Sequence, residues 1–543
     1  MLNKTDFIHA QGQKIVDGNG QEILLRGVGL GSWLLPEGYM WCFPNEGDRP
    51  RRIEGMVEAL LGKEKALDFW TSYFTNYIAE KDIEQIAKEG FNSLRLPINA
   101  RFLMDEATFA YHENHFLIID QFLDWCEKHN IYVILDLHGA LGGQTGTNID
   151  DSAHDQPDLF TNPLYQDMTV KLWRTLAERY NKRTIIAAYD LLNEPLPNWF
   201  SQYNEQILPL YERIITAIRE VDPCHMITLE GVHWSTDWSI FSKDLPDDNL
   251  LLQFHKYWNN PDTESISQYL KAREEWNVPI FMGEGGENNK NWYTGAFRLF
   301  EDHNISWNFW TWKKMNTTNS PCSIKKPDGW DRLVRYLTHG EEVEPGLAEE
   351  ILWTYLENMK FENCDYHSDV VRSLFRRPNV TIPAIFYGYK GEGISHYGKQ
   401  PRTNTPAFRA GDAMEIRFVQ EGSRKVSFEH GQGQEWTNEE WLCLHLHGEE
   451  WVVYNFQADR DYGESELRIS IHVSALEDDP ELELHINDKV LDRRQITDSR
   501  WHDVDFVVPS PLKKGDHSIK LKSCGSLRVQ YLSLTSDGHV QCF

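Results

Sequence analysis

The sequence lacks several features that would assign it to a large class of proteins. No stretch of eighteen or more apolar residues occurs, and residues 1–7 contain no apolar segment of the kind found in a secretory signal. Basic residues are scarce as well, since 54 Lys and Arg stand against 83 Asp and Glu and give a formal charge of −29. Nucleic acids and anionic membranes need basic patches. The sequence therefore predicts no membrane span, no signal peptide and no nucleic-acid partner, and favours a neutral ligand.

Cysteines are few and widely separated. The sequence has eight of them, and none forms a CxxC pair: Cys42, Cys126, Cys224, Cys322, Cys364, Cys443, Cys524 and Cys542. This distribution is typical of free thiols in a reducing compartment rather than of a disulfide framework or a zinc site. We therefore predict a cytoplasmic protein, or a secreted one if a signal peptide has been removed from the chain.

Strand-like and helix-like patterns alternate over roughly the first 370 residues. Short apolar runs predict eight strands, at 24–30, 92–96, 132–137, 187–192, 226–230, 250–254, 279–283 and 306–311. Apolar residues three or four apart predict helices between most of them. Eight such units predict an α/β fold, a (β/α)₈ TIM barrel. A hairpin over residues 8–25 is predicted to precede it, with residues 17–20 as the turn between strands at 14–16 and 23–25. A doubly wound open sheet would need a phosphate loop that leads into a helix, and residues 27–33 have the glycines without the helical pattern.

Two of the predicted strands end in a glutamate. Tyr189–Pro195 is an apolar run that closes with Asn193 and Glu194, and Val278–Glu284 is a second apolar run that closes with Glu284. A carboxylate at a buried strand end costs several kcal/mol unless it is paired, so each position asks for a partner. In a barrel both ends would meet at the same face. Two carboxylates brought together in this way are what a glycosidase requires.

Other polar or aromatic residues fall at the same ends of the predicted strands. They are Arg95, His138, Asn193, His255, Tyr257 and Trp310. Taken alone, each histidine is as readily structural as functional, and Trp310 is more often a core residue. A guanidinium inside an apolar strand, as at Arg95, needs a carboxylate. No second histidine at helical spacing supports a metal site at residues 136–138, so neither a metal nor another cofactor is expected. So many polar and aromatic residues at the same ends of the predicted strands favour one functional site over independent packing roles.

These residues lie in motifs that resemble glycoside hydrolase family 5. The motifs are Leu25–Val28, Leu94–Pro97, Asp136–Gly139, Leu192–Pro195, His255–Tyr257, Gly283–Glu284 and Trp307–Lys313. Residues 29–37 and 138–146 are most similar to the exo-β-1,3-glucanases and related β-glucosidases of that family. Asn260 stands where that branch carries an aromatic residue, so the +1 subsite is expected to differ.

The resemblance implies a role for each residue. Glu194 would be the acid/base and Glu284 the nucleophile of a retaining double displacement. Arg95 and Tyr257 would contact the nucleophile, and Asn193 the sugar 2-hydroxyl. The remaining positions would belong to the −1 subsite, with Glu37 binding the terminal sugar and Trp310 forming the stacking platform beside His138 and His255. An arginine near Glu284 favours its charged form, while burial without a cation would favour a protonated Glu194.

The pattern changes after about residue 411. Residues 378–411 are rich in Gly, Pro, Asn and Thr, which is typical of a linker. From 412 on, apolar residues alternate with polar ones in short runs, at 414–418, 451–454, 467–471, 482–486, 517–521 and 527–531, which predicts a β-sandwich. Residues 448–454 and the Trp501 stretch resemble jelly-roll carbohydrate-binding modules of families 6 and 35. We predict a barrel domain over 1–400, a linker over 401–411 and a sandwich over 412–543 that either binds carbohydrate or only packs.

The combined expectation is a retaining β-glycosidase of exo type, acting on an oligosaccharide or a small glycoside with a terminal β-glucosyl unit. A β-diglycosidase or β-mannosidase on the same fold is the nearest alternative. A non-catalytic carbohydrate-binding protein is the alternative from another class, although a binding protein has no use for a nucleophile. The sequence does not predict an oligomeric state.

Overall fold

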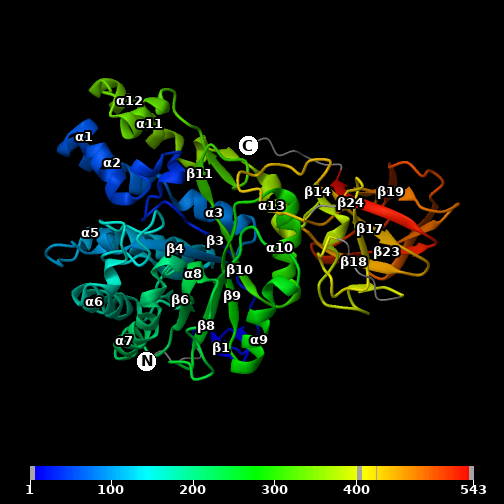
Figure 1. The fold of residues 1–543 in the computed structure, drawn as a ribbon, viewed down its shortest axis with the longest axis horizontal. Helices are drawn as coiled ribbons and strands as arrows, with labels where there is room; N and C mark the ends of the chain where they lie inside the picture. Colours follow the sequence, from blue (N-terminus) through cyan, green and yellow to red (C-terminus); the bar gives the residue numbers. More distant parts are fainter. Residues whose placement is uncertain (1–5, 400–405, 423–424, 537–543) are drawn as a thin grey trace. The chain divides into compact units, whose positions relative to one another are not determined.

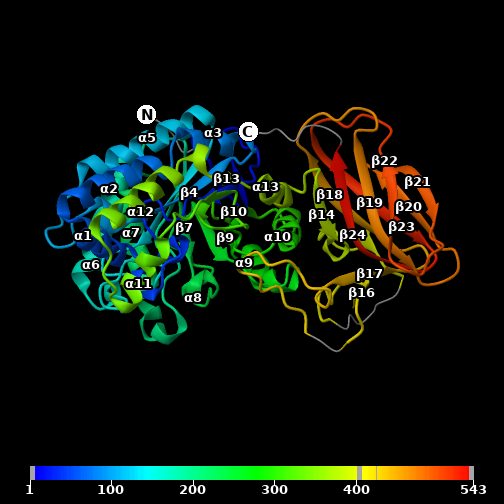
Figure 2. The ribbon, with the colours of Figure 1, turned by 90° about the horizontal axis from the view of Figure 1, so that it is seen from above.

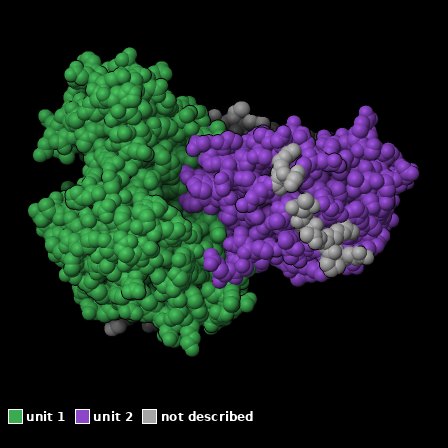
Figure 3. All heavy atoms as spheres, in the orientation of Figure 1, with its two compact units in different colours: residues 1–256, 269–286, 305–366 green, residues 257–268, 287–304, 367–543 purple. Residues whose placement is uncertain are grey.

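The computed structural model describes residues 6–399, 406–422 and 425–536. They divide into two compact units, which Figure 3 shows in different colours. The first unit comprises residues 1–256, 269–286 and 305–366. The second comprises residues 257–268, 287–304 and 367–543. In the described part of the chain no helix is long and apolar enough to cross a membrane.

The first unit is built on a closed barrel of eight parallel strands, which confirms the predicted fold class (Figures 1 and 2). Around the barrel the order is β10-β3-β4-β5-β6-β7-β8-β9. The strands are β3 (Arg26–Gly29), β4 (Ser93–Asn99), β5 (Tyr132–Gly139), β6 (Ile186–Asp190), β7 (Met226–Glu230), β8 (Leu250–His255), β9 (Ile280–Gly286) and β10 (Ser306–Trp310). Each overlaps a predicted strand, because strands buried on both faces read as apolar runs.

The helices follow the strands in the expected alternation. They are α1 (Pro50–Leu61), α2 (Lys63–Asn76), α3 (Glu80–Lys88), α4 (Ala100–Leu103), α5 (Glu113–His129), α6 (Pro163–Tyr180), α7 (Ile207–Arg219), α8 (Val232–Ser235), α9 (Ser267–Trp276), α10 (Lys290–Asp302), α11 (Trp330–His339), α12 (Pro345–Asn358) and α13 (Ser368–Phe375). Three short strands lie beyond the barrel: β11 (Lys313–Met315), β12 (Cys322–Ile324) and β13 (Asp365–Tyr366).

A hairpin precedes the barrel, as predicted, but its pairing is different. Strands β1 (His9–Gln11) and β2 (Lys14–Val16) pair with each other, because Gly12 takes the positive φ that this tight turn requires. The predicted partner at residues 23–25 forms no strand, and only Val16 and Glu22 form a bridge across the expected turn. Ile8 and Ile15 join a buried cluster with Ala187, Met226 and Phe281, near the start of barrel strands. The hairpin therefore closes the amino-terminal end of the barrel.

The C-terminal part of the second unit contains two antiparallel sheets, as predicted for a β-sandwich. One has the order β16-β17-β24-β19-β22 with β14 added to β24, and the other the order β15-β18-β23-β20-β21. The strands are β14 (Val380–Pro383), β15 (His396–Tyr397), β16 (Glu415–Phe418), β17 (Leu442–Leu446), β18 (Trp451–Ala458), β19 (Leu467–Ala475), β20 (Glu481–Ile486), β21 (Lys489–Gln495), β22 (His502–Val507), β23 (Gly515–Cys524) and β24 (Leu527–Ser536).

The sheets begin earlier in the chain than the predicted sandwich. Strands β14 and β15 precede the predicted linker 401–411, of which residues 401–405 lie outside the described residues. Arg409 is buried and donates hydrogen bonds to the carbonyl oxygens of Ile385, Tyr387 and Gly388. Residues near 409 therefore pack within the second unit. The domain boundaries themselves stay a prediction.

Candidate active site

The two glutamates predicted as catalytic come together at the carboxyl-terminal end of the barrel. Glu284 lies within β9, and Glu194 follows β6 by four residues. A carboxylate oxygen of each and a ring nitrogen of His255 all lie within 4.8 Å of one another. Glu194 has a φ of +43°, a region that is uncommon outside glycine. Its backbone N–H donates to Oε2 of Glu230 at 2.8 Å, so this turn is held by a neighbouring strand end.

Arg95 is the centre of the charged network beneath the two glutamates. Its guanidinium is fully buried and donates to Glu284, to Asp190 Oδ2 at 2.9 Å and to Glu230 Oε1 at 3.0 Å. Nη2 also lies 3.2 Å from Oδ2 of Asp136. Burial alone would lower the pKa of Arg95, but these four carboxylates raise it well above its usual value. The guanidinium is therefore a permanent cation against Glu284, in the contact that the sequence predicted.

His255 lies between the two glutamates. Its Nδ1 is 2.6 Å from Oε1 of Glu194 and 3.6 Å from Oε2 of Glu284, and its Nε2 is 3.5 Å from Oε1 of Glu230. Burial opposes the charge on the ring, but the three carboxylates raise the pKa of His255 well above 6.5. The expectation that Glu194 is buried without a cation is wrong, because β8 brings His255 into hydrogen-bond contact with it.

His138 is fixed as a neutral ring. Its Nδ1 is 2.7 Å from Oδ2 of Asp136, and burial lowers its pKa to about 4. With Nδ1–H donating to Asp136, Nε2 is left as an acceptor for the Asn193 amide, whose Nδ2 is 3.3 Å away. Oδ1 of Asn193 in turn accepts from Arg95 at 2.8 Å. Asn193 therefore joins the histidine to the charged network.

Glu37 and Trp310 flank His138. Oε1 of Glu37 lies 4.0 Å from Nε2 of His138, and Glu37 is only 2% exposed. The Trp310 ring stacks on the His138 ring with centroids 5.4 Å apart and an angle of 4° between the planes. Its Nε1–H donates to the hydroxyl of Tyr39 at 2.8 Å. These contacts hold both residues at the same end of the barrel as the glutamates.

Tyr257 is the one predicted residue that lies outside this unit. It follows β8 by two residues, and the division of the chain places it in the second unit. Its predicted contact with the nucleophile stays a prediction.

Sequence analysis missed Glu230, which ends β7 and contacts Arg95, Glu194 and Gln253. Burial opposes its charge, but His255 and Arg95 lower the pKa of Glu230 to about 2. The signal was available, since the run 226–230 also ends in a glutamate.

The grouping of Glu194, His255 and Glu284 also resembles a metal site in geometry. A metal needs a neutral imidazole with a free lone pair. Because the three carboxylates favour a protonated His255, the arrangement is better described as a network of ion pairs. Such a network places a permanent cation, Arg95, beside Glu284 and a protonated imidazole, His255, beside Glu194.

The barrel is similar in sequence to known glycoside hydrolases. Residues 59–316 match the model of the family described as Cellulase (glycosyl hydrolase family 5). The match spans every predicted site residue except Glu37. A "Beta-xylosidase" of Phanerodontia chrysosporium is 32% identical over 236 residues, which cover 43% of this chain and 48% of that protein. A "Probable glucan 1,3-beta-glucosidase A" of Aspergillus fumigatus is 29% identical over 273 residues, which cover 48% and 64%.

A third relative is an "Endoglucanase C" of Acetivibrio thermocellus, 26% identical over 310 residues, which cover 46% of this chain and 88% of that protein. The chain thus spans about half to two thirds of the length of the first two relatives. These three names thus include two glycosidases and one endoglucanase.

Proposed function

Residues 59–316 form a domain of glycoside hydrolase family 5, and from this premise we propose that the chain is a retaining, exo-acting β-glycosidase. Its substrate would be a short β-glucan or a small glycoside with a terminal β-glucosyl unit. The observation that carries the retaining mechanism is the distance between the two glutamates, whose nearest oxygens lie within 4.8 Å. Retaining enzymes place the two carboxyl groups about 5–5.5 Å apart, whereas inverting enzymes leave room for a water at about 6.5–9.5 Å.

Glu284 is the nucleophile in this proposal. Its contact with the buried guanidinium of Arg95 holds the carboxyl group in place for attack. Attack on the anomeric carbon forms a glycosyl ester with Glu284 while the bond to the leaving oxygen breaks.

Glu194 supplies the proton that the leaving oxygen takes up. In this proposal the proton is carried by the Glu194 carboxyl group, while Nδ1–H of the protonated His255 donates to Oε1 of Glu194 at 2.6 Å and is not transferred. After departure of the aglycone, the Glu194 carboxylate removes a proton from the incoming water, and the ester is hydrolysed with net retention. The imidazolium of His255 stabilises the carboxylate between the two steps.

Exo action is supported by Glu37. A pocket for a terminal sugar needs acceptors for hydroxyl groups that an internal sugar does not present. Glu37 is buried beside His138 and reaches the site from the loop after β3. The names of the β-xylosidase and glucan 1,3-β-glucosidase relatives agree with this proposal, while the endoglucanase relative favours an open cleft as the second candidate.

A reducing-end-labelled β-glucan oligosaccharide separates these candidates. The exo proposal expects one sugar to be released at a time, with its β-anomer detected first by NMR. Internal fragments at early times would establish the cleft instead. An α-anomer as first product would overturn the retaining mechanism. A panel of nitrophenyl β-glycosides, including β-mannoside and disaccharide derivatives, tests the alternative glycones, and no turnover of any of them would favour a non-catalytic binding protein.

For the β-sandwich we propose a role in carbohydrate binding, supported by a row of rings along one sheet. The His472 ring lies parallel to Tyr531, with centroids 4.8 Å apart, and to Trp501, with centroids 5.4 Å apart. Aromatic faces suit sugar rings. Trp501→Ala should weaken retention in affinity electrophoresis through β-glucan, and unchanged migration would favour a packing role alone.

The cytoplasmic location also remains a proposal. It is supported by the seven described cysteines, all of which are free thiols.

A further inference from the structure

Strands β16 and β17 bring two histidines and a glutamate together on one face of a sheet, far from the glutamates of the barrel in the sequence. Glu415 pairs directly with His445 across the antiparallel ladder. His447 lies two residues beyond His445, and side chains two apart in an extended segment share a face. Leu444 and Leu446 are buried, while both histidines are only half-buried. The alternation thus directs the two imidazoles away from the core of the sheet and toward Glu415.

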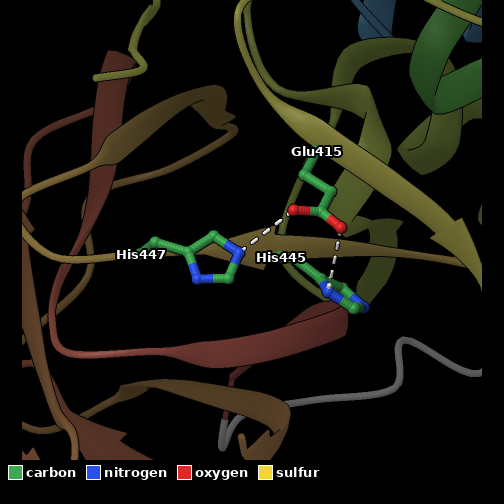
Figure 4. Close-up of side chains that lie close together, drawn as sticks. All are labelled: Glu415, His445 and His447. Carbon is green, nitrogen blue, oxygen red and sulfur yellow. Dashed lines mark hydrogen bonds and ion pairs between the residues drawn. The ribbon is translucent and has the colours of Figure 1, made fainter. Parts of the chain in front are cut away.

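Figure 4 shows the rings of His445 and His447 pointing toward the carboxylate group of Glu415. Nε2 of His447 is 3.2 Å from Oε2 of Glu415, and Nδ1 of His445 is 3.8 Å from Oε1. One nitrogen of each histidine and one oxygen of Glu415 all lie within 4.8 Å of one another. Two imidazole nitrogens and one carboxylate oxygen are a ligand set that zinc uses in proteins, with further positions left for water.

His447 and Glu415 are oriented by further contacts. Nδ1 of His447 is 3.1 Å from Oγ of Ser526, whose backbone N–H donates to Oε1 of Glu477 at 2.8 Å. A hydrogen bond on the far nitrogen is how proteins orient a metal-binding imidazole. Arg417 donates to Oε1 of Glu415 at 2.8 Å, while Oε2 of Glu415 faces His447.

We propose that Glu415, His445 and His447 form a binding site for a divalent transition metal, with Zn²⁺ the best-suited ion. Imidazole nitrogens favour zinc, copper or nickel over calcium and magnesium, which prefer ligand sets made entirely of oxygen. The site belongs to the β-sandwich and makes no use of the residues assigned to glycoside hydrolysis.

The test uses the full chain after treatment with EDTA and removal of the chelator. Zn²⁺ binding is measured by calorimetry, and Co²⁺ binding by the visible absorption of the bound ion. We expect one site that is lost in His447→Ala and in Glu415→Gln. Ser526→Ala should retain the site with an affinity lowered about 10- to 100-fold, the usual cost of removing a group that orients a ligand.

Two matched controls complete the design. His485→Ala removes another half-buried histidine that contacts a glutamate, Glu483, at 2.6 Å, and should leave binding unchanged. Glu284→Gln changes the second cluster of three His and Glu side chains in the described residues, formed by Glu194, His255 and Glu284, and should also leave Zn²⁺ binding unchanged. Loss of binding only in Glu284→Gln would place the metal in the barrel and overturn the proposal. Two other results would also overturn the proposal. One is the absence of binding by the folded wild-type chain at a 100-fold excess of Zn²⁺ over protein, and the other is equal binding by every variant.

Discussion

Replacing Glu37 by alanine tests the proposed pocket for a terminal sugar most directly. The structure fixes the backbone of this residue and buries its side chain. The backbone N–H of Glu37 donates to Oγ of Ser32 at 3.2 Å, and the same hydroxyl accepts from Nε1 of Trp41 at 3.1 Å. Ser32 itself is buried with a φ of +68°. A buried side chain on a fixed backbone has fewer conformations to lose when a sugar hydroxyl donates to it than an exposed side chain has.

The expected size of the effect follows from one charge-assisted hydrogen bond to the terminal sugar. Such a bond contributes about 1.5–3 kcal/mol, which corresponds to a decrease of about 10- to 150-fold in kcat/KM. Glu37→Gln keeps an acceptor oxygen without the charge, so its loss should be smaller than that of Glu37→Ala. Because the contact is to the sugar at the cleaved bond, the loss should appear on a monosaccharide aryl β-glucoside.

The assay is steady-state hydrolysis of that glycoside, with thermal unfolding as a check on the fold. Glu46→Ala is the matched control, because Glu46 is an exposed glutamate of the same loop region and should leave kcat/KM unchanged. The pocket is refuted if Glu37→Ala is silent on the monosaccharide, or if its loss appears only on long oligosaccharides.

Three further predictions concern the chemistry and the fold. Glu284→Gln should abolish turnover of every glycoside, whereas Glu194→Ala should spare a dinitrophenyl glycoside and recover further with azide; equal loss in both would contradict the assigned roles. Because the pKa of His138 is lowered to about 4 in the folded chain, the unfolded chain binds a proton at this ring first as the pH falls below 6.5, and the free energy of unfolding should decrease by about 3 kcal/mol between pH 6.5 and 4. His138→Gln should reduce this pH dependence of the free energy of unfolding. An unchanged slope would count against a neutral ring. A chain ending at Tyr366 should be insoluble, because α10 packs on α13 and Arg376 donates to Thr294 O; a soluble, active product would show that the barrel stands alone.

The barrel could be predicted because its information is local. Each of the eight strands is an apolar run, and the two glutamates were visible where two of those runs end. The same reasoning found β16, β18 and β24 from alternation. It failed for β21 and β22, whose sequences, from Lys489 and His502, are largely polar and exposed, so their pairing is set by neighbouring strands rather than by their own pattern.

Contacts across the barrel and across the sheets could not be predicted in this way. The hydrogen bond between His255 and Glu194 joins residues 61 positions apart. His255 ends β8 and Glu194 lies in the loop after β6, and β7 separates these two strands. It depends on the closure and stagger of the barrel, which the composition of either strand does not encode. The pairing of Glu415 with His445 depends in the same way on strand register, and a shift of one residue would separate them.

The position of Arg95 has a consequence for the whole reaction cycle. From β4 it contacts carboxylates on four other strands: Asp136, Asp190, Glu230 and Glu284. Ester formation at Glu284 would leave the contacts of Arg95 with Asp136, Asp190 and Glu230 in place, and these contacts would hold the guanidinium where it is. The sugar in the first step and the water in the second step would then bind beside the same arrangement of Arg95 and its carboxyl partners. If the reaction proceeds in the proposed two steps, the aglycone would leave and the water would enter over a network of side chains that stays in place.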